Sequence, residues 1–308
     1  MAIVKKCNVS ASVQNTGIEC SAAMGATKMF LLVPSGVTWT ANQIADFVTT
    51  INTARHGASA SRVYPIFGNQ APIITINVND EDDVTEKFDN GSEVFVRSGF
   101  ANRIYETNQG GLCYAKALRS FLNSGYYFVE VDDQGNFIVK KNEDGTFSGF
   151  PAAYLGGKTP TAGSFKTVYK NRFGISYDPT IYINSGEIYS NGEGLLDLMG
   201  LIDAELSDAG SPSTTGVNVS IKTECAETDL VALLDSEWAQ VSNFVVTKVS
   251  DGSAVTPSAV TIVGGHVHIA GTFASASVYT VALAAPSVLK TNGIEGYEGT
   301  VSVDITIP

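Results

Sequence analysis

The chain has 308 residues, of which 44% are hydrophobic and only 16% are charged, so it is long enough for two domains and too apolar for an intrinsically disordered protein. With 31 acidic against 19 basic residues, the formal net charge is -12, which disfavours tight wrapping of nucleic acid and adhesion to an anionic membrane. The longest uninterrupted apolar runs, such as residues 29–33, are far shorter than the roughly 20 residues needed to cross a bilayer, so we expect no membrane span.

The first third of the chain predicts strands around one helix. Residues 28–34 form an apolar run that ends in a Pro-Ser-Gly turn, as is typical of a buried strand. Thr40 and Gln43 have the spacing of a capping box, and the apolar residues that follow recur with a helical period, which predicts a helix near residues 41–55. Residues 62–67 and 73–78 then return to the composition of strands.

The centre of the chain predicts further β-structure with two helices. Residues 93–97 read as a strand, and an apolar stripe predicts a helix near residues 111–123. Two β-rich runs, 126–131 and 137–140, are joined by the Gly-containing segment 132–136, which predicts a hairpin. Further along, two strands and a last helix are expected at 165–172, 180–184 and 194–207.

A Ser/Pro/Thr/Gly segment at residues 210–216 predicts a linker between two domains, 1–209 and 217–308. Beyond it the strong segments are β-type, with turns at the spacing of a β-sandwich, and residues 230–234 fit a short helix. The β-type segments are 243–248, 259–263, 266–269, 278–283 and 300–307. Residues 279–307 resemble the end of an immunoglobulin or fibronectin type III domain, which implies an Ig-like C-terminal sandwich.

The N-terminus predicts no secretory leader, because the lysines of residues 1–7 are followed by Asn8, Ser10, Ser12 and Gln14 where an apolar region is required. A sandwich of this kind usually decorates surfaces outside the cell. A virion protein that is assembled in a bacterial cytoplasm and exposed on release of the particle reconciles the two observations.

The four cysteines lack the C-x-x-C spacing of a zinc knuckle or a redox dithiol. Cys7 and Cys20 could meet across an N-terminal hairpin, but assembly in the cytoplasm predicts reduced thiols, and Cys113 and Cys225 are then expected to be free as well.

Nothing in the chain predicts catalysis, a metal or a cofactor. His56 has no nucleophile suggested by the sequence, and His266 and His268 share a strand face without a third ligand. Gly110-Gly111 and Gly156-Gly157 lack the spacing of a phosphate-binding loop and are interpreted as turns. We therefore expect a protein that is not an enzyme.

The densest acidic cluster is at residues 79–86, and it departs from the calcium-loop pattern. A solvated loop is the simplest interpretation of this cluster.

The middle of the chain resembles structural proteins of phages and prophages of Bacteroidetes-type bacteria, and within that group it is most similar to tail tube proteins. The resemblance spans about residues 70–185 and lies in Asp82-Asp83, Glu86, and the segments 88–97, 110–121 and 128–137. It implies a mainly β protein, with a tail-tube-like β-sandwich or barrel and flanking helices, to which the Ig-like domain is added.

Tube proteins of this kind close into rings, commonly of six subunits, that stack into a conduit for DNA. The resemblance therefore implies partners in the form of other copies of the chain and other virion proteins, without specific nucleic-acid binding. An acidic bore would repel phosphate, and we assign the acidic cluster to it as a hypothesis. The residues concerned are Asp80, Glu81, Asp82, Asp83, Glu86 and Asp89.

Two alternatives remain at this stage. A capsid decoration or head-fibre protein would use the same assembly without a leader and the same exposed sandwich. A carbohydrate-binding protein would need a cleft lined by aromatic residues, and Trp39 and Trp238 are the only tryptophans.

Overall fold

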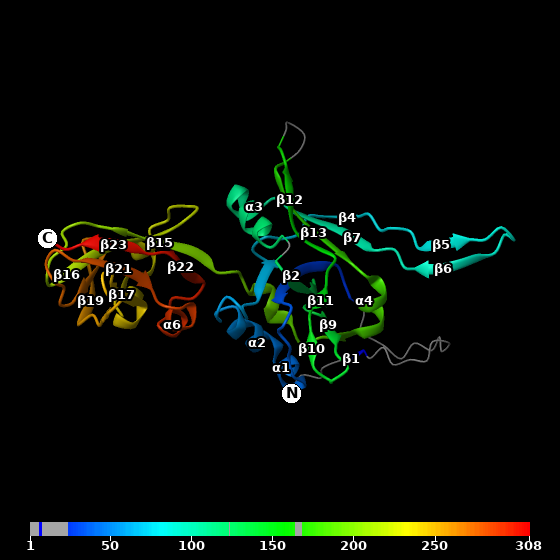
Figure 1. Cartoon of the computed structure of the whole chain (residues 1–308), viewed down its shortest axis with the longest axis horizontal. Helices are drawn as coiled ribbons and strands as arrows, with labels where there is room; N and C mark the ends of the chain where they lie inside the picture. The colour runs from blue at the N-terminus through cyan, green and yellow to red at the C-terminus, as the bar shows by residue number, and fades with distance from the viewer. Residues whose placement is uncertain (1–5, 8–23, 123, 164–167) are drawn as a thin grey trace. The chain divides into compact units, whose positions relative to one another are not determined.

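The computed structural model describes residues 6–7, 24–122, 124–163 and 168–308 (Figure 1). The protein is mainly β and divides into two compact units. The N-terminal unit comprises Met1–Arg55 and Ser59–Met199, and the C-terminal unit comprises His56–Ala58 and Gly200–Pro308.

The N-terminal unit contains two main sheets, and within the described ranges neither closes into a barrel. The larger sheet has eight strands, in the order β1 (Lys6–Cys7), β14 (Gly186–Tyr189), β9 (Phe137–Lys141), β8 (Tyr126–Asp132), β2 (Thr27–Pro34) and β3 (Tyr64–Phe67), with β10 (Phe147–Ser148) paired to β9 and β11 (Phe150–Pro151) paired to β8. The second sheet, which we call the arm sheet, runs β12 (Tyr154–Thr161), β13 (Lys170–Tyr177), β7 (Ala101–Thr107) and β4 (Thr75–Val78).

Strand β2 is buried on both faces, as its uninterrupted apolar run predicts. Because side chains alternate along a strand, Met29, Leu31 and Val33 belong to one core and Phe30 and Leu32 to another. The first core is completed by α1 (Ala41–Ala45), α2 (Phe47–Ala54) and the 3-10 helix η1 (Glu193–Asp197). The second lies between the larger sheet and the arm sheet and includes α3 (Gly111–Ser120), which packs on β12 and β13.

Several sequence-based predictions for this unit are confirmed. The helix near 41–55 is present as α1 and α2, with the Thr40–Gln43 capping box formed, and the helix near 111–123 is α3. The predicted hairpin is β8 and β9, with Val131 opposite Phe137. The pairing suggested for Cys7 and Cys20, and part of the strand expected at 165–172, lie outside the described residues; the strand that follows is β13.

The strand expected at residues 180–184 is wrong, because this segment forms α4 (Pro179–Ser185). Asp178 caps the helix by accepting a hydrogen bond from the Thr180 amide at 2.8 Å, and Pro179 occupies the first turn. A capped start with proline in the first turn favours a helix even where β-branched residues follow.

The helix expected near 194–207 is also wrong. Leu195 and Leu198 lie at a 3-10 turn in the first core of the N-terminal unit, whereas Ala204 and Leu206 lie on strand β15 (Ile202–Asp208) in the core of the C-terminal unit. The apparent helical stripe therefore combined residues that belong to two separate cores.

The C-terminal unit is a sandwich of two sheets around one core. One sheet runs β19 (Ala259–Val263), β20 (His266–Ala270), β16 (Gly216–Thr223), β15 and β22 (Tyr297–Val301), and the other runs β18 (Ala254–Val255), β17 (Phe244–Lys248), β21 (Val278–Leu283) and β23 (Val303–Thr306). The connections include α5 (Leu230–Leu234), as expected, η2 (Asp235–Trp238), η3 (Val241–Asn243) and α6 (Pro286–Thr291). Trp238 is fully buried and its indole N–H donates to the Leu230 carbonyl at 2.8 Å.

Residues 210–216 are not a linker in the structure. They connect β15 to β16 within one antiparallel pair, and the Ala209 amide donates to the Asn218 carbonyl at 3.0 Å. The boundary between the units lies at Met199 and Gly200, ten residues before the predicted one. A turn rich in Ser, Pro, Thr and Gly has the same composition as a linker, so composition did not separate the two.

This boundary gives a test on fragments. We expect residues 200–308 to fold cooperatively, and residues 210–308 to lose at least about 3 kcal/mol of unfolding free energy or fail to fold, because deleting β15 removes buried Ala204 and Leu206. Urea unfolding followed by circular dichroism, with both fragments under the same reducing conditions, measures the difference. Equal midpoints would restore the boundary at residue 210.

Candidate assembly interface

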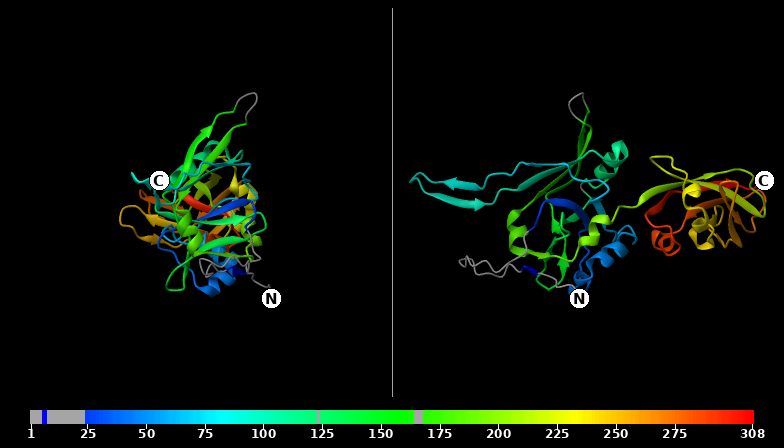
Figure 2. Two further views of the ribbon diagram at one scale, coloured as in Figure 1. Left: turned by 90° about the vertical axis from the view of Figure 1, so that its right-hand side faces the viewer. Right: turned by 180° about the vertical axis from the view of Figure 1, so that it is seen from behind.

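In the described part of the N-terminal unit, the most exposed element is a hairpin formed by β5 (Val84–Lys87) and β6 (Glu93–Arg97). We call this hairpin, together with the preceding residues 80–83, the arm. In Figure 1 and in the rear view of Figure 2 the arm extends beyond the rest of this unit, from the end of β4 and the start of β7. All nine residues of its two strands are exposed.

The arm carries apolar side chains with no core to cover them. Val94, Phe95 and Val96 are 50%, 57% and 56% exposed, and Phe88 at the tip is 47% exposed. The tip is ordered by Gly91, whose φ is +83°, and by the Asn90 side chain, which accepts from the Ser92 amide at 3.0 Å. An isolated two-stranded hairpin is marginally stable in water, and exposed apolar patches on a surface mark sites of contact.

The acidic cluster predicted from the sequence lies on this arm, and three of its members hold the base together. Asp80 accepts from the Asn102 amide at 3.0 Å and Asp83 from the Gly99 amide at 3.1 Å, while Glu81 lies 3.9 Å from the Arg97 guanidinium. These contacts join the outgoing and the returning segment of the arm at the point where it leaves the arm sheet.

At the base of the arm, position 99 requires a glycine. A Cβ at this position would overlap the carbonyl oxygens of Glu81 and Asp82, because the two backbone segments of the arm approach too closely here for any side chain.

The remaining acidic residues of the cluster, Asp82, Glu86 and Asp89, are exposed. Among the described residues none of the three side chains has a hydrogen bond or ion pair. The arm as a whole, residues 80–97, carries seven acidic against two basic residues, Lys87 and Arg97. The arm is therefore both apolar and strongly negative.

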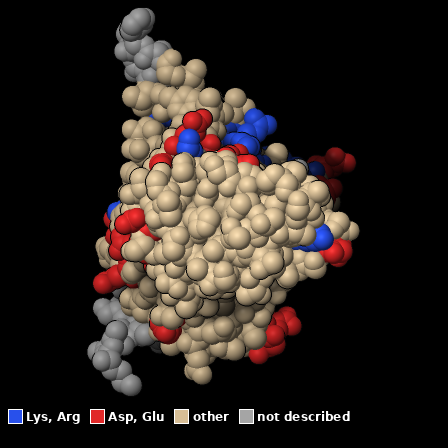
Figure 3. Space-filling view, turned by 90° about the vertical axis from the view of Figure 1, so that its left-hand side faces the viewer, with Lys and Arg blue, Asp and Glu red and all other residues tan. Residues whose placement is uncertain are grey.

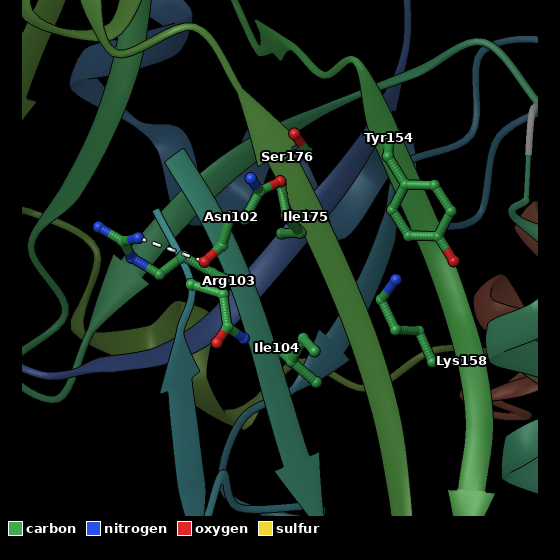
Figure 4. A pocket seen from close by; sticks show the side chains of 8 residues that line it. Asn102, Arg103, Ile104, Tyr154, Lys158, Ile175 and Ser176 are labelled. Atoms are coloured by element: carbon green, nitrogen blue, oxygen red, sulfur yellow. Dashed lines mark hydrogen bonds between the residues drawn. The ribbon is translucent and has the colours of Figure 1, made fainter. Parts of the chain in front are cut away.

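At the base of the arm, the arm sheet carries a cavity of about 320 Å³. Figure 4 shows the side chains of Tyr154 and Lys158 side by side on β12, with the Lys158 Nζ 4.2 Å from the centre of the Tyr154 ring. Arg103 points away from Lys158 in the same view and forms an ion pair with Asp80. The cavity is lined by Asn79, Asn102, Arg103, Ile104, Tyr154, Lys158, Ile175 and Ser176.

Lys158 was not singled out by the sequence, because Gly156-Gly157 before it was interpreted as a turn, and that interpretation is wrong. Both glycines lie inside β12, and a Cβ on Gly157 would approach the Arg119 amide nitrogen to 2.7 Å. They are small because α3 packs closely on this strand. Gly110 and Gly111, with φ of +79° and +52°, do form the turn that starts α3.

Lys158 belongs to a row of cations across the arm sheet. It lies opposite Arg172 on β13, which lies opposite Glu106 on β7. Glu106 pairs with Lys170 at 2.8 Å and with Arg172 at 3.3 Å. One carboxylate thus pairs with two cations, and within the described chain the third cation, Lys158, has no carboxylate partner. We call Lys158, Lys170 and Arg172 the basic row.

The histidines do not form a site. His266 and His268 bond to Ser220 at 2.9 Å and Asn218 at 2.7 Å on the neighbouring strand β16, so both are part of one sheet surface. In the described part of the chain, no three His, Cys, Asp or Glu residues group as they would around a metal ion. His56 is buried.

The cysteine prediction is wrong for Cys113 and Cys225. Both are disulfide-bonded, and no cysteine in the described ranges is free. The prediction depended on an assumed reducing compartment, and spacing along the chain carries no information on which thiols lie near one another in the fold.

None of the helices in the described ranges is long and apolar enough to cross a membrane. Figure 3 shows that the face of the C-terminal unit turned to the viewer is largely free of charged side chains, so this face offers no basic patch for phosphate.

The second core of the N-terminal unit contains a group of tyrosines around Glu130. The Tyr182 hydroxyl donates to Glu130 at 2.8 Å, and burial raises the pKa of Tyr182 well above its usual value, as it does for Tyr105. Burial also raises the pKa of Tyr114 to about 12, although its hydroxyl accepts from the Phe67 amide at 3.0 Å. The hydroxyls of Tyr182 and Tyr114 are thus hydrogen-bonded inside the core.

No protein-family model and no curated protein matches this chain.

The raised tyrosine pKa values predict alkaline sensitivity. Because the folded pKa values lie above the ordinary value of 10.0, the unfolded chain loses these protons first. Their contribution to stability is full below pH 10; that of Tyr114 is lost as the pH rises through 12, and that of Tyr182 also falls as the pH rises above 10. Denaturant unfolding at pH 8 to 12 should show this fall, with a shallower slope for Tyr182→Phe. A stability that stays constant above pH 10 would contradict the buried positions.

Proposed function

We propose that this chain is a self-assembling structural protein of a virion, a tail tube subunit that closes into rings, commonly of six, which stack into a conduit for DNA. The observation that carries the proposal is the arm, which exposes Val94, Phe95 and Val96 on a two-stranded hairpin without a core. Contact with another copy would cover these side chains and stabilise the hairpin.

The sheets of the N-terminal unit support the same reading. Strand β4 is an edge strand of the arm sheet and exposes Ile76 and Val78 at 39% and 58%. Open edges with apolar side chains are a liability in a monomer and are covered when a neighbouring chain completes the sheet. A tube wall made of repeated subunits provides such a neighbour at each position.

The C-terminal unit fits an Ig-like module carried on the outside of the particle. Its first strand, β15, pairs in parallel with β22 near the end of the chain, and both sheets enclose one core. The disulfide-bonded state of Cys113 and Cys225 fits a protein that ends outside the cell, where disulfides persist. DNA in the bore and other virion proteins would be the remaining neighbours.

Electron micrographs of the purified full chain at high concentration test the proposal. We expect rings and stacked rings. Monomers or trimers that bind empty capsids would favour a capsid decoration protein instead, and a lone monomer at all concentrations in sedimentation would overturn self-assembly.

The role of the arm is tested by Phe95→Ser. Because Phe95 is exposed in the free chain, its unfolding free energy should change by less than about 0.5 kcal/mol. Its association constant should fall by roughly tenfold or more, because burial of a phenylalanine in a contact contributes about 1.5–3 kcal/mol. Sedimentation velocity measures the association.

The matched control for this variant is Val245→Ser, which alters an apolar side chain of 49% exposure on the C-terminal unit. It should leave the association constant unchanged. If Phe95→Ser assembles as the wild type does, the arm is not part of the assembly contact.

A further inference from the structure

Resting on the proposed self-assembly, we infer that the arm tip of one copy, Phe88-Asp89, inserts into the Tyr154–Lys158 cavity of the next copy. The partner is thus a second copy of this chain, and the contact joins two different surfaces of it.

The two surfaces have opposite charge. The arm carries an excess of five negative charges, with seven acidic and two basic residues, and its tip residue Asp89 has no partner among the described residues. The receiving cavity contains Lys158, which has no carboxylate partner among the described residues, and the cations next to it in the basic row, Lys170 and Arg172, share the single carboxylate of Glu106. This is a local positive surface on a protein whose net charge is -12, so it attracts a segment as strongly negative as the arm.

The two surfaces also have complementary shape and polarity. The cavity volume of about 320 Å³ lies within the range of sites that enclose a side chain or small ligand. Its walls combine the Tyr154 ring and Ile104 with the Lys158 ammonium. Phe88 offers an exposed aromatic ring next to the Asp89 carboxylate, and an aromatic anchor in a pocket is the usual centre of a protein contact.

The arm cannot reach its own cavity in the conformation described. The cavity is lined by Asn79 and Asn102 at the base of the arm, and the arm runs away from this base (Figure 1). Insertion therefore takes place between copies. Because tip and cavity are different surfaces, the contact is head-to-tail and repeats from copy to copy, which yields a ring if the rotation closes and a filament if it does not.

This contact gives Asp89 a role other than lining the bore. A carboxylate paired with Lys158 of a neighbour is neutralised and adds no repulsion to passing phosphate. Bore lining and subunit contact are therefore alternative roles for this residue, and the same variants separate them.

The test is a charge exchange in the full chain, followed by sedimentation velocity. We expect Lys158→Glu and Asp89→Lys each to weaken association by about tenfold or more, and the double variant to regain most of it, because the pair is restored with its signs reversed. Lys222→Glu, an exposed charge reversal on the C-terminal unit, is the control and should have no effect. Phe88→Ala should weaken association even at 500 mM salt, where the ionic part is screened.

The outcomes separate this inference from the proposed function. If wild-type chains assemble and the single charge reversals assemble equally well, the inference fails and self-assembly stands. If both single variants weaken association and the double variant does not recover, Asp89 and Lys158 are not partners and the inference also fails. If the wild type does not associate at all, both fail. Circular dichroism melting of each variant verifies that the subunit remains folded.

Discussion

The N-terminal unit depends on the burial of strand β2 on both of its faces. Met29, Leu31 and Val33 fix the helical layer on one side, and Phe30 and Leu32 fix the arm sheet on the other. Full burial of each side chain of this size contributes about 1.5–3 kcal/mol to the stability of the fold, so this one strand stabilises both cores. This central position makes the arm sheet a firm base from which the arm extends, and a firm base is what a projecting contact element requires if its tip is to meet a neighbour at a defined place.

The sequence predicted those parts of the fold in which the local pattern and the tertiary environment agree. The hairpin at 126–140 was correct because a Gly-containing turn joins two runs that both lie in the core. The stripe at 195–206 was wrong because its apolar residues serve two cores, and periodicity alone does not show which core a residue joins. At 180–184, the cap at Asp178 and Pro179 outweighed β-branched composition.

The sequence predicted only one of the two surfaces of the candidate interface. The acidic cluster was identified, but its interpretation as a solvated loop could not distinguish Asp80 and Asp83, which tie the arm together, from Asp89, which is left without a partner in the described structure. The basic row was not visible, because Lys158, Lys170 and Arg172 come together only through the pairing of β12 with β13. A strand register is a property of the folded sheet, and charges that meet across strands carry no spacing signature along the chain.

In the proposed assembly, the distribution of charge would give the two surfaces different roles. Copies of a protein with a net charge of -12 repel one another at long range, so assembly needs local attraction that acts at close approach. A negative arm and a positive row on the same subunit supply this attraction only in the head-to-tail orientation, because arm against arm and row against row are both repulsive. Exposed apolar side chains such as Phe95 would then add affinity without selecting orientation, since burial of apolar area is non-directional. In the proposed arrangement, charge would determine which surfaces meet, and the apolar side chains would determine how tightly they bind.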